Sequence, residues 1–253
     1  MTSTIETGIR ISGESRDFSA YWEIARTYGS WHFQINSLEL HALRGISETV
    51  REEFGRAELS YYLGSKDHIG ELLLDRLDAL LQVLTEFRAK FLVIPFSSFR
   101  ALELCEVSSS DIIQLLVHEA EERHFLLCLE ATVDDEEESE TAPASLLHLK
   151  ETYPSHFFLF SINIDGLKKV PSLPTYTRVL RASIATVHLQ LDKRFLRDTS
   201  PRCEKDELAA LVGHLYWLPF KQQPLVFTNP LEDLEDIYKR FYAIVNARGY
   251  WYN

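Results

Sequence analysis

The chain has 253 residues, a formal net charge of −12 and a pI near 5.2. Its hydrophobic content of 45% and charged content of 25% are ordinary for a folded protein and exclude a disordered one. The acidity disfavours contact with bulk nucleic acid or an anionic membrane, and no run approaches the roughly 18 apolar residues of a membrane span.

The first 90 residues alternate between short strand patterns and amphipathic helix patterns. Short alternating runs predict strands at 8–12 and 57–64. Apolar residues at spacings of three and four predict helices at 17–28, 37–54 and 67–90.

Three continuous apolar runs follow, at 91–95, 125–131 and 156–163. Each is short and bounded by turn or polar residues, which is typical of a buried strand. A helix is predicted at 109–124, between the first two runs. The sequence therefore predicts a single α/β (or α+β) domain, with a mixed, partly parallel sheet and long amphipathic helices on its faces.

The last third of the chain reads as mainly helical. A helix over 175–197 would place Ile184 on its apolar face and Arg178, Arg181 and His188 on its exposed face. A further helix at 204–217, a strand at 224–229 and a closing helix at 230–247 complete the prediction.

An acidic run interrupts the chain between Asp134 and Glu140, where six of seven residues carry a carboxylate. Like charges at this density stay hydrated, so we expect a mobile acidic surface loop over 134–145. The alternative is a boundary between two domains, 1–133 and 146–253.

Upstream of the acidic run lie candidate metal ligands, His118, Glu122 and His124. A zincin motif needs two histidines four residues apart on one helical face, and here the spacing of the histidines is six. A metal site would therefore need a further ligand from elsewhere, and the competing interpretation is a solvated helix face.

Two segments are candidates for anion binding. Ser65 and Lys66 lie between a predicted strand and a predicted helix, where free backbone N–H groups can hold a phosphate, although the favoured interpretation is a simple helix cap, which needs no ligand. Arg178 and Arg181 belong to the basic 166–205 segment, which carries nine basic and three acidic residues. That segment is the one place where nucleic acid is expected to bind, unless it pairs with the protein's own acidic surface.

The chain ends in three consecutive aromatic residues, Tyr250, Trp251 and Tyr252, which either dock on the core or anchor a partner. The three cysteines form no C-x-x-C pair, and the N-terminus lacks the pattern of a secretory signal, so we expect a cytoplasmic location.

No complete catalytic or cofactor motif is present. The sequence therefore favours a non-enzymatic interaction protein, such as a bacterial adaptor, immunity or defence accessory subunit, with no cofactor and with a protein partner or a homo-oligomer. The alternatives are a metal-dependent hydrolase or nuclease using His118, Glu122 and His124, and a nucleotide-responsive domain using Ser65, Lys66, Arg178 and Arg181.

Overall fold

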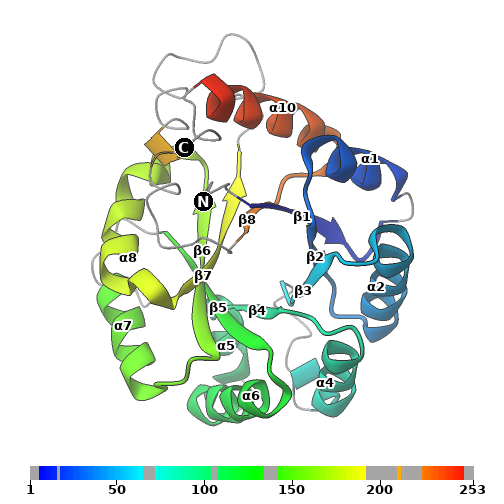
Figure 1. The fold of residues 1–253 in the computed structure, drawn as a ribbon. Helices are drawn as coiled ribbons and strands as arrows, with labels where there is room; N and C mark the ends of the chain where they lie inside the picture. Colours follow the sequence, from blue (N-terminus) through cyan, green and yellow to red (C-terminus); the bar gives the residue numbers. More distant parts are fainter. Residues whose placement is uncertain are drawn as a thin grey trace.

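The computed structural model describes residues 6–15, 18–64, 72–73, 75–103, 108–133, 142–191, 210–211, 213 and 224–247. Eight parallel strands in these residues form one closed barrel (Figure 1). The strands are β1 (Thr7–Ser12), β2 (His32–Asn36), β3 (Glu58–Tyr62), β4 (Phe91–Pro95), β5 (Leu126–Thr132), β6 (Phe158–Asp165), β7 (Ile184–Gln190) and β8 (Leu225–Phe227).

Helices surround the barrel on its outside (Figure 1). They are α1 (Ser19–Tyr28), α2 (Leu40–Phe54), α4 (Leu77–Glu86), α5 (Phe96–Glu103), α6 (Ser109–Arg123), α7 (Pro143–Thr152), α8 (Leu173–Leu180) and α10 (Leu231–Ala247), with 3-10 turns η1 (Leu167–Ser172) and η2 (Arg181–Ser183). This arrangement is the TIM-type barrel, in which every strand runs in the same direction and the helices form an outer ring.

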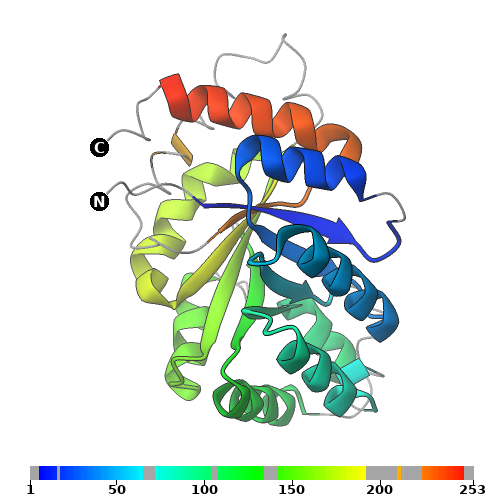
Figure 2. The ribbon, with the colours of Figure 1, turned by 45° about the vertical axis from the view of Figure 1, so that its right-hand side comes forward.

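The last strand closes the barrel by pairing with the first. Val226 of β8 lies opposite Gly8 of β1 on one side and opposite His188 of β7 on the other. Helices α1 and α10 lie side by side over this seam (Figure 2). The predicted mixed sheet is therefore wrong, because every pairing is parallel and the sheet has no open edge.

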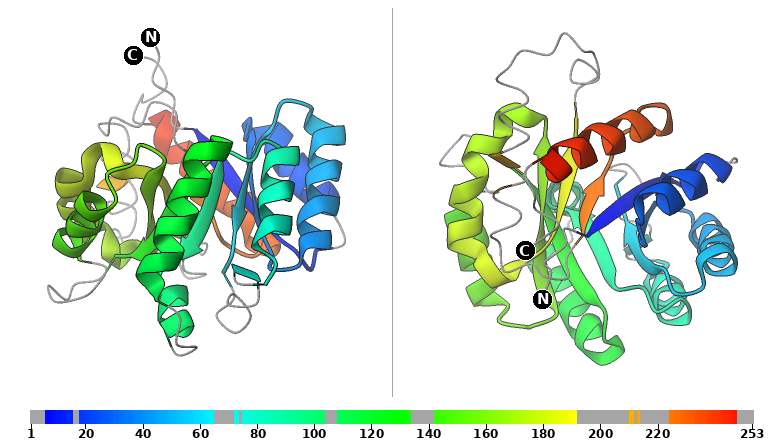
Figure 3. Two further views of the ribbon diagram at one scale, coloured as in Figure 1. Left: turned by 90° about the horizontal axis from the view of Figure 1, so that it is seen from below. Right: turned by 45° about the horizontal axis from the view of Figure 1, so that its top comes forward.

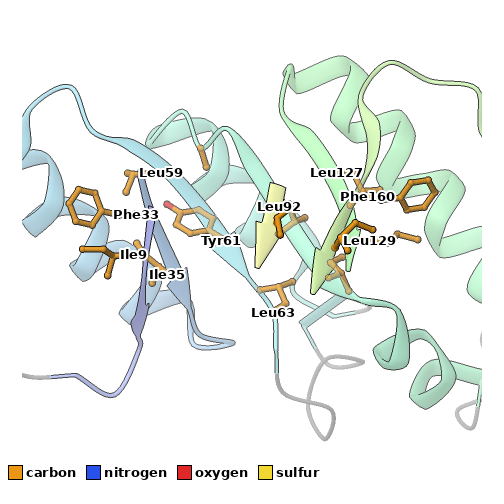
Figure 4. Packing of buried hydrophobic residues seen from close by; sticks show 14 of the residues in the cluster. Ile9, Phe33, Ile35, Leu59, Tyr61, Leu63, Leu92, Leu127, Leu129 and Phe160 are labelled. Atoms are coloured by element: carbon orange, nitrogen blue, oxygen red, sulfur yellow. The ribbon is translucent and has the colours of Figure 1, made fainter. Parts of the chain in front are cut away.

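The strands have an apolar outer face and a partly polar inner face. Outward residues such as Ile9, Phe33 and Leu127 are fully buried against the helices in one continuous core (Figure 4). Successive side chains of a strand point to opposite sides, so the residues between these outward residues form the inner face of the barrel. Near the amino ends it carries a smaller apolar cluster that includes Phe91 and Cys128.

Several predicted elements are confirmed. Strands β4, β5 and β6 occupy the three apolar runs, and α6 and α10 match the helices predicted at 109–124 and 230–247. Helix α6 begins where expected because the Ser108 side chain accepts a hydrogen bond from the Asp111 backbone N–H at 3.4 Å.

The helix predicted at 175–197 is wrong. Helix α8 ends at Leu180, Arg181 takes a left-handed φ of 34°, and the chain continues as strand β7. The β-branched residues Ile184, Thr186 and Val187 favour this extended backbone. Strand β2 was not predicted at all, because polar residues occupy its inward positions.

The acidic run from Asp134 to Glu140 and the C-terminal aromatic residues lie outside the described residues. The mobile acidic loop and the alternative domain boundary beside it therefore stay predictions. Among the described residues, no helix combines the length and apolarity needed to cross a membrane.

The packing of Trp22 generates a stability prediction. Trp22 is 7% exposed, and its ring centroid lies 5.5 Å from that of Phe33 and 5.3 Å from that of Phe54. Trp22→Ala should lower the free energy of unfolding by about 3–5 kcal/mol, measured by urea denaturation. Trp31, 51% exposed, is the control, and Trp31→Ala should cost less than about 1 kcal/mol. Equal losses in the two variants would contradict this packing.

Candidate functional site

Five polar side chains meet inside the barrel, toward the carboxyl ends of the strands. They are Arg10 of β1, Gln34 of β2, Tyr62 of β3, Glu130 of β5 and His188 of β7. In TIM-type barrels this is the end at which active sites are built. We call these five residues the central cluster.

Glu130 is the hub of the central cluster and is 5% exposed. Its Oε2 accepts a hydrogen bond from the Tyr62 hydroxyl at 2.5 Å, and its Oε1 lies 2.5 Å from His188 Nδ1. The Arg10 guanidinium adds a positive charge, with Nη2 at 3.6 Å from Oε1. Both carboxylate oxygens are therefore satisfied, as a buried charge requires.

Arg10 is held by two further contacts. Its Nε donates to Gln34 Oε1 at 2.8 Å, and its guanidinium carbon lies 3.6 Å from the centre of the Tyr62 ring. The side chain remains 13% exposed, more than the 4% of the Glu130 side chain. Arg10 is thus the charged member of the cluster with the greater access to solvent.

The hydrogen-bond directions fix the proton on His188. Because Arg10 can only donate, Gln34 Oε1 must accept, so the amide Nε2 of Gln34 points to His188 Nε2 at 3.1 Å and donates to it. The other ring nitrogen, Nδ1, then carries the proton and donates a hydrogen bond to Glu130 Oε1. Arg10 Nη2 also lies 2.8 Å from Nδ1, but this contact is no hydrogen bond in that tautomer, since both atoms bear protons. The Ser161 hydroxyl lies within 3.3 Å of both ring nitrogens.

The environment sets the charge of each group. Burial raises the pKa of Glu130, but the hydrogen bond from His188, the charge of Arg10 and the hydrogen bond from Tyr62 outweigh burial and leave the pKa lowered. Burial, followed by the charge of Arg10, lowers the pKa of His188 to about 4. Burial, with the Glu130 charge next, raises the pKa of Tyr62. At neutral pH the cluster therefore holds an ionised Glu130 and Arg10 beside a neutral imidazole and a neutral phenol.

The donor set does not fit a divalent metal ion. Within the described part of the chain, no group of three or more His, Cys, Asp or Glu side chains is placed to hold one. Glu130 and His188 could supply two metal ligands, but they are hydrogen-bonded to each other. The Arg10 guanidinium already provides a positive charge beside them. A second cation at this point would be repelled by Arg10.

The predicted metal ligands lie elsewhere. His118 and Glu122 are exposed on α6, outside the barrel, and His124 is exposed at its C-cap. All three are described residues, and they form no group that could hold a metal.

The predicted anion-binding residues are not brought together in the described structure. Arg178 is exposed in the last turn of α8, Arg181 is exposed just after it, and Ser65 and Lys66 lie outside the described residues. The expectation that His188 shares an exposed face with these arginines is wrong, because it is fully buried in β7. The proposed partner anchors Tyr250, Trp251 and Tyr252 also fall outside the described residues.

Sequence reasoning missed the central cluster. A signal was present, since Glu130 is the single carboxylate inside the apolar run 125–131 and Arg10 the single charge inside 8–12. Burying an ionisable side chain in such a run is costly unless it has a partner. The partners come from distant strands, so the sequence did not identify them.

Solved structures share this fold at low sequence identity. A D-tagatose 3-epimerase-like protein matches with a TM-score of 0.60 at 14% identity, over 95% of this chain and 98% of its own. The 3-keto-D-glucoside 4-epimerase from E. coli matches with a TM-score of 0.61 at 11% identity, over 96% and 100%. D-psicose 3-epimerase from Clostridium cellulolyticum H10 matches with a TM-score of 0.60 at 9% identity, over 98% and 99%.

No protein-family model matches the sequence, and no curated protein is close enough in sequence to match it. The likeness to the epimerases therefore shows the fold alone. It nevertheless contradicts the predicted non-enzymatic adaptor, immunity or defence subunit, and it fits neither the metal-dependent hydrolase or nuclease nor the nucleotide-responsive domain. The protein partner or homo-oligomer and the cytoplasmic location stay predictions.

The lowered pKa of His188 predicts acid sensitivity. The unfolded residue takes up a proton near pH 6.5 and the folded residue only near pH 4, so between these values the unfolded state binds more protons. The free energy of unfolding should therefore fall as the pH drops from 6.5 to 4, by up to about 1.4 kcal/mol per pH unit for this group.

His188→Gln should lessen that fall, measured by urea denaturation at a series of pH values. It should not abolish it, because burial also lowers the pKa of His32. The exposed His118 is the control, and His118→Gln should leave the slope unchanged. An unchanged slope in His188→Gln would contradict the assignment.

The role of Gln34 gives a second test. In Gln34→Glu, the new carboxylate accepts from Arg10 and also from His188 Nε2–H, so both ring nitrogens become donors and the imidazolium is favoured. The pKa of His188 should rise well above 4, as followed by ¹⁵N NMR of the ring nitrogens. Gln114→Glu, exposed on α6, should leave it unchanged. If His188 titrated with its wild-type pKa in Gln34→Glu, the assigned directions of the hydrogen bonds from Arg10 through Gln34 to His188 would be wrong.

Proposed function

We propose that this protein is an enzyme that moves a proton on a carbon next to a carbonyl group of a small polyhydroxylated substrate, as an isomerase or epimerase of sugars does. One observation carries the proposal. An ionised carboxylate, Glu130, is buried toward the carboxyl end of a closed parallel barrel, where Tyr62 and His188 donate to it and Arg10 lies beside it.

Three members of the central cluster, Glu130, Arg10 and Tyr62, have direct roles in such a reaction. Glu130 accepts the proton from the carbon, and the electron pair of the broken C–H bond moves onto the carbonyl oxygen to give an enediolate. Arg10 and Tyr62 stabilise the negative oxygen, through charge and through a hydrogen bond. For an isomer, the hydroxyl proton of the enediolate moves to the other oxygen, and Glu130 returns its proton to the former carbonyl carbon. For an epimer, a proton from solvent reaches the original carbon on its opposite face, and Glu130 releases its proton to solvent.

The contacts that hold the central cluster together also set the basicity of the Glu130 carboxylate. Burial raises the pKa of Glu130, and its hydrogen bonds and the Arg10 charge lower it. When a substrate oxygen takes over the Tyr62 hydroxyl and the Arg10 guanidinium, Glu130 loses two of these stabilising interactions while it stays buried. Its pKa then rises, and it becomes a stronger base at the moment the oxyanion needs the donors.

Two further observations support the substrate class. At neutral pH the central cluster contains one negative charge, on Glu130, and one positive charge, on Arg10, so it presents little net charge to a ligand. An uncharged, polyhydroxylated compound suits such a site. The solved structures that share the fold include a D-tagatose 3-epimerase-like protein, D-psicose 3-epimerase and 3-keto-D-glucoside 4-epimerase.

The test is proton exchange at carbon. The purified protein is incubated with a panel of ketohexoses and keto-glucosides in D₂O, and loss of the C–H signal and formation of an isomer are followed by ¹H NMR. Glu130→Gln should lower the rate by about 10²–10⁴-fold through loss of the base. Tyr62→Phe and Arg10→Gln should each lower it by about 10²–10³-fold through loss of oxyanion stabilisation.

A matched control is Glu122→Gln, which changes an exposed carboxylate on α6 and should leave the rate unchanged. A chelator should not slow the wild type, because Arg10 supplies the positive charge. Exchange that proceeds equally in Glu130→Gln, or no exchange with any member of the panel, would overturn the proposal.

A further inference from the structure

A cavity lies at the other end of the barrel from the central cluster, at the amino ends of the strands. Its volume is about 540 Å³, and its walls are the segments that lead from α2 into β3, from α4 into β4 and from α6 into β5. These three helices stand next to one another on one side of the barrel (Figures 1 and 3). None of the central cluster lines this cavity.

The cavity is strongly cationic in an acidic protein. Its wall carries four cationic side chains, those of Arg51, Arg88, Lys90 and Arg123, and the imidazole of His124. Among its lining residues the single carboxylate is that of Glu58, although the net charge of the chain is −12. The carboxylate is ionised, since nearby His32 and Lys90 hold the pKa of Glu58 at about 2 although burial opposes them. Glu58 offsets only one of the four cations, and Lys90 Nζ lies 2.7 Å from it.

The other cations are only partly used within the protein. Arg51 donates to the carbonyl oxygens of Gly55, Ala57 and Phe87, and Arg123 pairs with Glu119 outside the cavity. These bonds fix the side chains but leave further guanidinium N–H groups on each arginine, since a guanidinium has five. The Arg88 side chain is exposed and has no ion pair with any residue in the described ranges.

The backbone supplies an independent observation. Three non-glycine residues in the described chain have positive φ, and two of them line this cavity, Arg88 at 48° and His124 at 59°. Glycine adopts this conformation without strain, and other residues persist in it at a conformational cost that is typical of functional sites. Both positions therefore keep a side chain where a plain helix ending would favour glycine.

Compensation of the helix dipoles explains these basic residues less well than anion binding does. Basic side chains near helix C-termini are favoured, and α4 and α6 both end here. That effect is satisfied by any basic residue in the last turn with ordinary helical angles. It requires neither a left-handed arginine nor the convergence of cations from three separate segments on one cavity.

We infer that this cavity binds a compact, multiply charged oxyanion, such as a phosphate or polycarboxylate group, with Arg88 as its principal contact. The site lies at the opposite end of the barrel from Glu130 and does not depend on the chemistry proposed there.

The experiment measures binding of pyrophosphate, and of citrate as the carboxylate arm, by calorimetry at low ionic strength with Arg88→Gly. Glycine takes a φ of 48° without strain, so this variant should melt at or above the wild-type temperature. Its affinity for the anion should nevertheless fall at least tenfold. Arg88→Lys should retain part of the affinity, because it keeps the charge.

The matched control is Arg181→Gly, which replaces the third left-handed residue, an exposed arginine outside this cavity, and should leave anion affinity unchanged. Glu130→Gln should also leave it unchanged, which separates this site from the proposed enzyme activity. Amide NMR shifts of Ala57, Ala89 and Phe125 on adding pyrophosphate to the wild type give a second readout. No binding of either anion, equal binding in Arg88→Gly, or shifts confined to other residues would overturn the inference.

Discussion

The charge of Glu130 inside the barrel is the constraint on which the rest of the interior depends. Removing a carboxylate from water costs several kcal/mol unless hydrogen bonds and an opposite charge compensate it. Tyr62, His188 and Arg10 provide that compensation, and Gln34 holds two of them in place. These residues come from five strands, so the compensation exists only in the closed barrel. Losing one member leaves the others buried and partly unsatisfied, which is why the cluster acts as a unit.

The parallel topology places two different chemistries at opposite ends of one barrel. Because all eight strands run the same way, their carboxyl ends meet around the central cluster and their amino ends meet the C-termini of the preceding helices. Negative helix ends gather at the amino face, and basic side chains there offset them and leave a cationic cavity. No residue of the central cluster lines this cavity, so a change at one end need not disturb the other.

The polar interior also explains why two strands escaped prediction. In β2, the inward residues His32, Gln34 and Asn36 are polar, so the segment lacks the apolar run that marked β4, β5 and β6. Strand β7 is short and closely follows helix α8. Ile184 continues the apolar spacing of α8 by coincidence, so the segment was predicted as part of that helix. Polar residues buried inside the barrel thus broke the local pattern that would have identified their own strands.

The sequence by itself determined most of the elements that the structure describes, among them strands β4, β5 and β6 and helices α6 and α10, because hydrophobic periodicity is a local property. It also contained the lone charges Arg10 and Glu130 within apolar runs. Only the tertiary structure decided that the strands close into a barrel, since closure depends on β8 pairing with both β1 and β7. It alone brought Arg10 and His188, 178 positions apart, to 2.8 Å, because long-range strand order and register have no local signature in a single chain.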